Sequence, residues 1–392
     1  MSKTIVALDC MGGDNAPFEI VKGAVEATNE NKDILVKLVG VEEQIKEELS
    51  KYKYNSDQLE IVNATEIIET GEPPVAAIRE KTDSSLVKCL YMVKKGEADG
   101  MVSAGSTGAN LVGGHVIIGR LKGVQRPPLA PLIPTKNGAA LLIDCGANVD
   151  SRPSHLVQFA KIGATYMENI VGVKNPRVGL VNIGAEEEKG NALTKEAYQL
   201  LKETKGINFI GNVEAREIPE GVADVVVCDA FVGNVILKLY EGVGGVLLSK
   251  IKGTITNGIK NKLGALLIKK DLKKTLKTFQ IEEYGGAPLL GLKGLLVKTH
   301  GNSKAVEIKN SIFQCATFKE MDLNNKIKEK LTMEDLIDYS YNSQRPLTLK
   351  PLKNFQQFIN NEKIDNNEFI ISVFDLCNQL IQILKLMLIN FN

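Results

Sequence analysis

Residues 184–191, GAEEEKGN, bring three carboxylates, one lysine and a Gly-Asn pair together just before a predicted helix. Lys189 could hold an anion or polarise a carbonyl group. The alternative is a charged helix start, in which the glutamates lie near the positive end of the helix dipole. The residue pattern alone leaves both interpretations open.

A second motif, DAFVGN at residues 229–234, follows an apolar run. Asp229 could position a nucleophile, and Asn234 could donate to a developing oxyanion. Alternatively, Asp229 caps the helix that follows. We favour the functional interpretation because Asn234 directly follows Gly233 at the predicted ligand-binding edge. His300, in KTHGNS after another apolar run, is the histidine that we expect to contact a ligand.

Five loops rich in Gly, Asn and Asp follow apolar runs along the chain. Glycine allows backbone N–H groups to approach a ligand closely, and N–H groups at a helix start favour an anion. We therefore expect a cleft for a phosphorylated or other anionic substrate. Its expected binding residues are Asp9, Gly12, Gly13, Asp14, Ser106, Thr107, Gly108, Asn110, Asn148 and Asn191.

Several common chemistries have no signature in the sequence. Neither nucleotide-binding glycine fingerprint is met, and no cluster of His, Cys and Asp has metal-ligand spacing. We expect no cofactor and no metal. An anion site without an evident protein nucleophile fits a reaction in which the substrate anion is itself the nucleophile.

The elements that must position these residues alternate between strands and helices. Apolar runs without internal alternation predict strands at residues 4–9, 35–39, 59–62, 100–103, 139–144, 177–182, 208–211, 222–228 and 294–298. Helices are predicted at residues 17–29, 41–52, 84–95, 154–171, 191–204 and 234–252. This order predicts an α/β fold with a largely parallel, doubly wound sheet and ligand loops at the carboxyl ends of its strands.

Bulk properties limit the possible functions. The 392 residues carry a net charge of +1, so any basic function must be local. The six scattered cysteines are expected to be reduced core residues of a cytosolic protein. MSKTIVALD at the start reads as a strand rather than a signal peptide, and no apolar run reaches the ~18–20 residues of a membrane span.

A basic amphipathic segment at about 250–280 is the main local exception to the neutral charge. It predicts a surface helix packed on the core, a nucleic-acid patch or a helix lying on a membrane. The residues expected at a membrane are Leu263, Leu267, Ile268, Leu272 and Leu276, with Lys269 and Lys273. We expect three glycines, Gly253, Gly258 and Gly264, to loosen the segment. Beyond residue 331 the composition changes, and we treat 332–392 as a separate extension of unknown role.

Seven long motifs carry a family resemblance. They are ALDCMGGDNAP, EPPVAAIREKTDSSLVKCLYMVKKGEADGMVSAGSTGANL, GRLKGVQRPPLAPLIPT, LLIDCGANVD, VGLVNIGAEEEKGN, DAFVGNVILKLYEG and YGGAPLLGLKGLLVKTHGNSKAVEIKNSI. In order and spacing, residues 3–331 strongly resemble the bacterial phosphate acyltransferase family, PlsX. We therefore treat residues 1–331 as one phosphate acyltransferase domain.

The resemblance implies an activity: acyl-[acyl carrier protein] and inorganic phosphate give acyl phosphate and free carrier protein, an early step of phospholipid biosynthesis. It also implies a homodimer and a three-layer α/β/α fold similar to isopropylmalate dehydrogenase and phosphotransacetylase, without nucleotide or metal. The alternatives are a phosphotransacetylase-like acyl-CoA:phosphate transferase, a dehydrogenase of related fold, and a non-catalytic lipid-surface scaffold.

The same resemblance gives the basic segment an expected use. The family is associated with peripheral membrane contact through this region, and its product passes to a membrane glycerol-3-phosphate acyltransferase. We therefore expect a cytoplasmic protein that docks on anionic membrane and binds no nucleic acid. Acyl carrier protein is acidic, so a lysine-rich face could attract it instead. A solvated dimer or core helix is the third interpretation.

Overall fold

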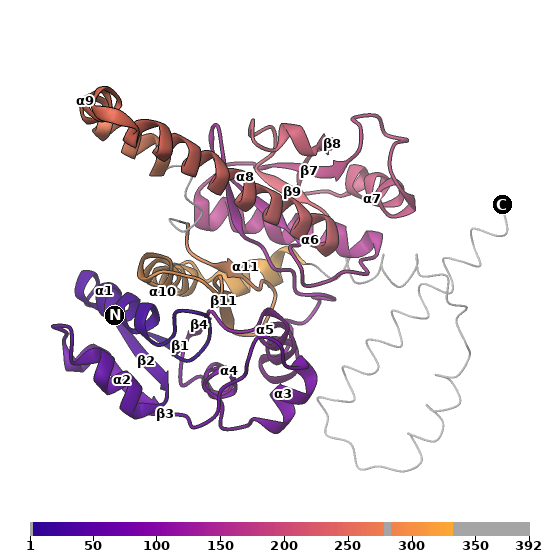
Figure 1. The fold of residues 1–392 in the computed structure, drawn as a ribbon. Coiled ribbons are helices and arrows are strands. Elements are labelled where there is room, and N and C mark those ends of the chain that lie inside the picture. Colours follow the sequence, from indigo (N-terminus) through magenta and orange to yellow (C-terminus); the bar gives the residue numbers. More distant parts are fainter. Residues whose placement is uncertain (1–2, 278–283, 332–392) are drawn as a thin grey trace, which may run out of the picture. The chain divides into compact units, whose positions relative to one another are not determined.

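The computed structural model describes residues 3–277 and 284–331, whose strands form two sheets (Figure 1). The six-stranded sheet has the order β10-β11-β4-β1-β2-β3. Its strands are β1 (Thr4–Asp9), β2 (Ile34–Gly40), β3 (Leu59–Asn63), β4 (Gly100–Ser103), β10 (Ala287–Pro288) and β11 (Leu295–Lys298). All neighbours pair in parallel except β10, which is antiparallel to β11.

The five-stranded sheet has the order β5-β6-β9-β7-β8. Its strands are β5 (Leu132–Thr135), β6 (Gly138–Ile143), β7 (Arg177–Asn182), β8 (Asn208–Glu214) and β9 (Val225–Val227). Again one edge strand, β5, is antiparallel to its neighbour. The inner strands of both sheets are continuous apolar runs, because helices cover the two faces of a mostly parallel sheet.

Helices cover both faces of the six-stranded sheet. Val6 and Leu8 belong to the apolar cluster that contains α1 (Phe18–Glu30) and α10 (Ala305–Glu320), whereas Ala7 belongs to the cluster with α4 (Ser85–Lys95). This alternation follows from the two-residue period of a strand. The remaining helices of this part are α2 (Glu42–Leu49), α3 (Pro74–Glu80), α5 (Thr107–Gly113) and α11 (Leu323–Lys330).

The five-stranded sheet lies between α8 (Ala230–Thr256) on one face and α6 (Pro153–Tyr166) with α7 (Ala192–Glu203) on the other. One core cluster runs from α6 to α10 and joins the two sheets. Within it, the rings of Tyr166 and Phe318 pack in a T-shaped arrangement, with 5.6 Å between their centroids and an interplanar angle of 74°. Short π-helical turns, Gly114–Ile118 and Met167–Val171, extend α5 and α6, and short 3-10 turns lie at Ser56–Gln58 and Ala215–Glu217.

Helix α8 has 27 residues and is followed after Asn257 by α9 (Gly258–Lys277). Exposed apolar side chains recur along α8 at Phe231, Val235, Leu239, Val243, Val246 and Leu247. By length and composition alone, α8 is the one helix of the described part that could cross a membrane. This differs from the expectation that no apolar run is long enough, because α8 reaches that length only with the charged residues Lys238 and Glu241 inside it.

The predicted α/β class and the largely parallel strands are confirmed. The strands divide into two sheets, so the ligand loops follow two sets of strand ends rather than one continuous edge. Gly253 and Gly264 lie inside α8 and α9, whereas Gly258 has φ +82° and starts α9 after the break between the two helices. The five cysteines in the described ranges are buried with free thiols, as expected. The extension at 332–392 lies outside the described residues.

Candidate active site

Three neighbouring strands of the six-stranded sheet end in a row of polar residues. Asp9 ends β1 and is paired in register with Ser103 at the end of β4, which is paired with Lys298 at the end of β11. Residues of one row on parallel strands point to the same face of the sheet. We call Asp9, Ser103 and Lys298 the strand-end row.

Asp9 is 1% exposed and is held by hydroxyl groups. Its carboxylate accepts hydrogen bonds from Ser85 Oγ at 2.6 Å and from Ser103 Oγ at 2.7 Å, and from the backbone N–H of Met11. Burial raises the pKa of Asp9 above its ordinary value, and these hydrogen bonds act in the opposite direction. The side chain is therefore a rigid, fully buried anchor for the loops around it.

Asn110 continues this network on α5. Its Nδ2 donates to Ser103 Oγ at 3.2 Å and to the carbonyl oxygen of Ser106 at 3.0 Å. Its Oδ1 is buried and has no hydrogen-bond partner within the described ranges. A buried acceptor without a partner is costly, which makes Asn110 a candidate for contact with a substrate donor.

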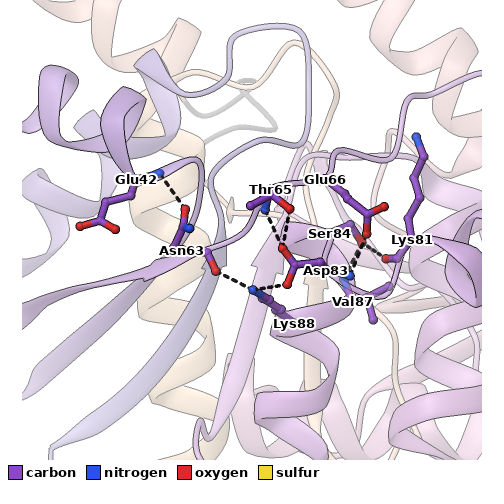
Figure 2. Close-up of polar contacts among 9 residues, drawn as sticks. All are labelled: Glu42, Asn63, Thr65, Glu66, Lys81, Asp83, Ser84, Val87 and Lys88. Carbon is purple, nitrogen blue, oxygen red and sulfur yellow. Dashed lines mark hydrogen bonds and ion pairs between the residues drawn. The ribbon is translucent and has the colours of Figure 1, made fainter.

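The loop before α4 is fixed by a second set of polar contacts (Figure 2). Asp83 accepts from Thr65 Oγ1 at 2.7 Å and pairs with Lys88 at 2.6 Å, while its own N–H donates to Glu66. Ser84 caps α4 by accepting from the N–H of Val87. These contacts fix the start of α4 and thereby aim Ser85, the next residue, at Asp9.

Two glycines bring the first loop against its neighbours. A Cβ at Gly12 would lie 2.5 Å from Asp9 Oδ2 and 2.7 Å from the backbone nitrogen of Gly105. Gly13 has φ +98°, and a Cβ there would lie 2.8 Å from the carbonyl oxygen of Gly301. Side chains at these positions would separate the loops that follow β1, β4 and β11. Two of the five predicted loops, those after β1 and β4, are thus brought together on this sheet beside the loop after β11, and the other three follow strands of the five-stranded sheet.

A second polar cluster follows β6 in the five-stranded sheet. Asp144 is fully buried and accepts from the N–H groups of Leu129, Ala147 and Asn148, and from Asn148 Nδ2 at 2.7 Å. Burial raises the pKa of Asp144 to about 6. The Asn148 carbonyl oxygen accepts from the N–H of Ala230, which ties this cluster to the start of α8.

Asp229 and Asn234 lie at the start of α8. The Asp229 carboxylate accepts from the N–H groups of Phe231 and Val232, which is the capping geometry. A Cβ at Gly233 would lie 1.8 Å from the carbonyl oxygen of Asp144, so only glycine allows this helix to approach β6 so closely. Asn234 is exposed beside Gly146, and its Oδ1 is 3.9 Å from the position of a Cβ at that glycine.

His300 connects the two sheets. It follows β11, and its Nε2 lies 2.8 Å from Oε1 of Glu241 on α8. Glu241 also pairs with Lys238 at 2.8 Å. Burial acts to raise the pKa of Glu241, but its contacts with His300 and Lys238 outweigh that effect and hold the pKa below its ordinary value. This pair therefore links the loop after β11 to the interior of α8, the helix that follows β9.

Other predicted residues lie apart from this link. Lys189 is exposed, and its carbonyl oxygen accepts from Asn182 Nδ2. Asn191 caps α7 by accepting from the N–H of Thr194, and Ser106 caps α5 by accepting from that of Ala109. Thr107 and Asp14 are exposed. Gly108 is packed against Pro74, which a Cβ would approach to 2.5 Å.

Five residues of these clusters were not predicted from the sequence: Ser85, Ser103, Asp144, Glu241 and Lys298. A signal existed for three of them, because Ser103, Asp144 and Lys298 each interrupt an apolar run at its last position or directly after it. Glu241 gave no such signal, since a glutamate on a helix is ordinarily a solvated residue. Across the described ranges, no group of three or more His, Cys, Asp or Glu residues could hold a metal ion.

Comparisons with known proteins agree with the motifs. Residues 4–326 match the family described as "Fatty acid synthesis protein". A phosphate acyltransferase of Clostridium perfringens is 52% identical over 327 residues, which cover 83% of this chain and 96% of the relative. A phosphate acyltransferase of Clostridium acetobutylicum is 50% identical over 327 residues, covering 83% and 98%.

Solved structures show the same fold at low identity. A phosphotransacetylase from Streptococcus pyogenes has a TM-score of 0.53 at 17% identity, covering 81% of this chain and 94% of that one. The EutD phosphotransacetylase from Staphylococcus aureus has a TM-score of 0.54 at 15% identity, covering 80% and 94%. From the match over residues 4–326 and the two relatives at 50% identity or more, we conclude that the chain belongs to the phosphate acyltransferase family of fatty acid synthesis proteins and is a transferase enzyme.

Proposed function

We propose that the chain transfers the acyl group of acyl-[acyl carrier protein] to inorganic phosphate, giving acyl phosphate and free carrier protein. The observation that carries this proposal is the link between His300 and Glu241, which joins the glycine-rich loops of one sheet to α8 of the other. The acyl donor and the phosphate must bind next to each other, and a site formed by both sheets allows this. The two Clostridium relatives are named phosphate acyltransferases, which supports phosphate as the acceptor.

The proposed chemistry is a single substitution at the thioester carbonyl. A phosphate oxygen forms a bond to the carbonyl carbon, and the electron pair of the C=O bond moves to its oxygen. When the tetrahedral intermediate collapses, the C–S bond breaks and the carrier leaves as a thiolate. Binding both partners in one site removes a large part of the entropic barrier of this bimolecular step.

Three polar groups have the exposure that contact with these substrates requires. Asn234 Nδ2 can donate to the oxyanion, and His300 is partly exposed at the link between the sheets. Lys189 is exposed beyond β7 and can meet an anionic part of the donor. Asp229 is proposed to act through its cap, which fixes the first turn of α8 and thereby Asn234.

The decisive experiment measures acyl phosphate formation from long-chain acyl-[acyl carrier protein] and phosphate, with acetyl-coenzyme A as a parallel donor. Turnover of the carrier substrate alone supports the proposal. Turnover of acetyl-coenzyme A alone would indicate the alternative, an acyl-CoA:phosphate transferase. Vesicle binding without turnover of either donor would indicate a non-catalytic scaffold.

The exposed face of α8 supports a homodimer. Phe231, Leu239 and Val246 are exposed at 65%, 65% and 59% on one helix, and such a row of apolar side chains is ordinarily covered by a partner. A second copy would cover it with an identical helix. Leu239→Glu should convert the dimer to a monomer in size-exclusion chromatography with light scattering, whereas Val116→Glu, at an exposed site away from α8, should not.

Helix α9 supports a cytoplasmic enzyme with peripheral membrane contact. Leu266, Leu267 and Ile268 are all exposed and are followed by exposed Lys269 and Lys270. Each lysine near an anionic surface contributes on the order of 1 kcal/mol, and apolar insertion adds to it. Docking would deliver acyl phosphate to a membrane glycerol-3-phosphate acyltransferase, early in phospholipid biosynthesis. Leu272, Leu276, Leu263 and Lys273 were expected in the same contact, and their side chains lie outside the described residues.

A further inference from the structure

Lys298 is a charged residue at the end of an otherwise apolar strand, LLVK, and is 8% exposed. Its Nζ donates to the carbonyl oxygen of Ala104 at 3.5 Å and to that of Thr299. An ammonium group has three N–H donors, so two carbonyl contacts do not exhaust it. Among residues 3–277 and 284–331, no carboxylate pairs directly with this ammonium group.

The charges around Lys298 come from four elements. Burial is the largest influence and lowers the pKa of Lys298 to about 8. Glu307 on α10, Asp9 on β1 and Asp14 in the loop after β1 favour the charged form at longer range, whereas Lys238 on α8 opposes it. A buried cation without a direct counter-ion is unfavourable for folding. An anion that binds beside it would remove that cost.

The backbone around Lys298 is built for close approach. The Ala104 carbonyl oxygen that accepts from Nζ lies 3.3 Å from the position of a Cβ at Gly13. The loop that follows Lys298 is fixed by Glu307, which accepts from the His300 N–H and from Ser303 Oγ at 2.6 Å. The glycine loops after β1 and β4 and this fixed loop therefore meet at the end of one buried lysine.

We propose that Lys298 is the residue that binds inorganic phosphate and offsets its charge during attack on the acyl donor. This inference rests on the function proposed above. It assigns the acceptor site to the strand-end row of the six-stranded sheet, and leaves Lys189 and Asn234 on the side of the acyl donor. Lys189 cannot replace Lys298, because Lys189 is exposed in the loop after β7, on the other sheet.

The test compares wild type with Lys298→Met, Lys298→Arg and the control Lys304→Met. Lys304 lies six residues further along the same connection, is exposed and pairs only loosely with Glu19 at 3.8 Å. Inorganic phosphate is titrated by calorimetry without any acyl donor, and the KM for phosphate is measured separately from kcat. Lys298→Met should weaken phosphate binding by about 10- to 100-fold, and Lys304→Met should leave it unchanged.

Calorimetry of the wild type in two buffers with different ionisation enthalpies gives a second readout. At pH about 8, phosphate should draw a proton onto Lys298, because an adjacent anion raises the pKa of a lysine. Lys298→Arg should lack this extra proton uptake while it retains part of the affinity, since a guanidinium stays charged. Equal proton uptake in wild type and Lys298→Arg would overturn the assignment.

The outcomes separate this inference from the proposed function. Acyl phosphate formation with an unchanged phosphate KM in Lys298→Met would refute the role of Lys298 and leave the activity standing. Phosphate binding that depends on Lys298, without turnover of acyl-[acyl carrier protein], would refute the activity and retain the anion site. If Lys298→Met fails to fold because the carbonyl oxygens of Ala104 and Thr299 lose their donor, the comparison of proton uptake between wild type and Lys298→Arg decides, and equal uptake would refute the role of Lys298.

Discussion

His300 Nε2 and Glu241 Oε1 lie 2.8 Å apart and join the loop after β11 to helix α8. Because Glu241 orients the imidazole, Glu241→Gln should displace His300 and lower kcat/KM roughly tenfold, with little change in stability. The matched control is Lys238→Met, which removes the other partner of Glu241 and leaves the His300 contact in place. Steady-state kinetics on the acyl transfer would check this, and an unchanged kcat/KM in Glu241→Gln would remove His300 from the site.

Ser85→Ala should destabilise the protein through Asp9. The variant removes a 2.6 Å hydrogen bond to a buried carboxylate, and the loss is about 1–3 kcal/mol in the free energy of unfolding. The pKa of Asp9, already raised by burial, should rise further because a bond that favours the charged form is lost. Any activity that depends on ionised Asp9 should then fail at a higher pH on the acid side.

Urea denaturation and a pH profile of kcat/KM measure these two effects. Ser50→Ala is the matched control, since it removes a hydroxyl hydrogen bond of 2.6 Å to the carbonyl oxygen of Glu47 at an exposed position. Water replaces an exposed bond at little cost, so this variant should lose less than about 1 kcal/mol. Equal losses in the two variants would contradict the anchor role of Asp9.

Asp229→Ala should remove the cap of α8 and cost about 1 kcal/mol of stability. Asp229→Ser should restore the cap, because serine accepts from the same N–H groups. The kinetics of the two variants separate positioning from direct catalysis. If serine restores kcat/KM as well as stability, the cap is sufficient; if activity stays low while stability returns, the carboxylate touches the reacting groups.

Asp144→Asn should change the pH dependence of stability. The folded pKa of Asp144 is about 6 and the ordinary value is 3.8, so the folded protein binds a proton that the unfolded chain releases between those values. This group therefore favours the folded state at low pH and becomes unfavourable as the pH rises to about 6. The free energy of unfolding of the variant should gain on wild type by up to about 3 kcal/mol over that range.

Thermal unfolding between pH 4 and 7 would measure this difference in the free energy of unfolding. Asp33→Asn, at an exposed position, is the control. A constant offset between Asp144→Asn and wild type would show that Asp144 is already ionised across the range.

Replacement of Leu266 and Leu267 by glutamate should abolish sedimentation with anionic vesicles while turnover of the soluble donor persists. Leu267 is 87% exposed, so the folded protein should tolerate the change. Each glutamate removes apolar surface and opposes the negative lipid surface. The matched control, Val171→Glu with Ile210→Glu, changes two exposed apolar residues elsewhere. Retained vesicle binding in the α9 variant would assign the contact to another surface.

The sequence predicted the strands closely, as for 100–103 and 177–182, because buried parallel strands are continuous apolar runs between turns. It missed β5, α3 and α5, which are short or begin inside glycine- and proline-rich segments, and it also missed the 16-residue helix α10. The division into two sheets was also missed, since the periodicity of each strand is the same whichever neighbour it finds. Partner choice depends on contacts between distant residues that the local pattern does not contain.

The candidate site was predicted in its loops and less well in its side chains. Gly12 and Gly13 could be predicted from the local sequence, because glycine in a loop after a strand indicates close approach of the backbone to a neighbouring segment. Ser85 and Asp9 are separated by 76 residues, and only the packing of α4 on β1 brings them together. Asp229 could be read as catalytic or capping from sequence, and its cap became visible only with the first turn of α8 in place.

The register of the strand-end row restricts how this protein can change length. Asp9, Ser103 and Lys298 share a row only while β1, β4 and β11 keep their present pairing. An insertion or deletion of one residue within any of these strands would turn its last side chain to the opposite face. Tolerated insertions should therefore lie in the surface connections. In a library of single-residue deletions, those within these three strands should abolish function, even where the deleted residue is a valine without a polar contact.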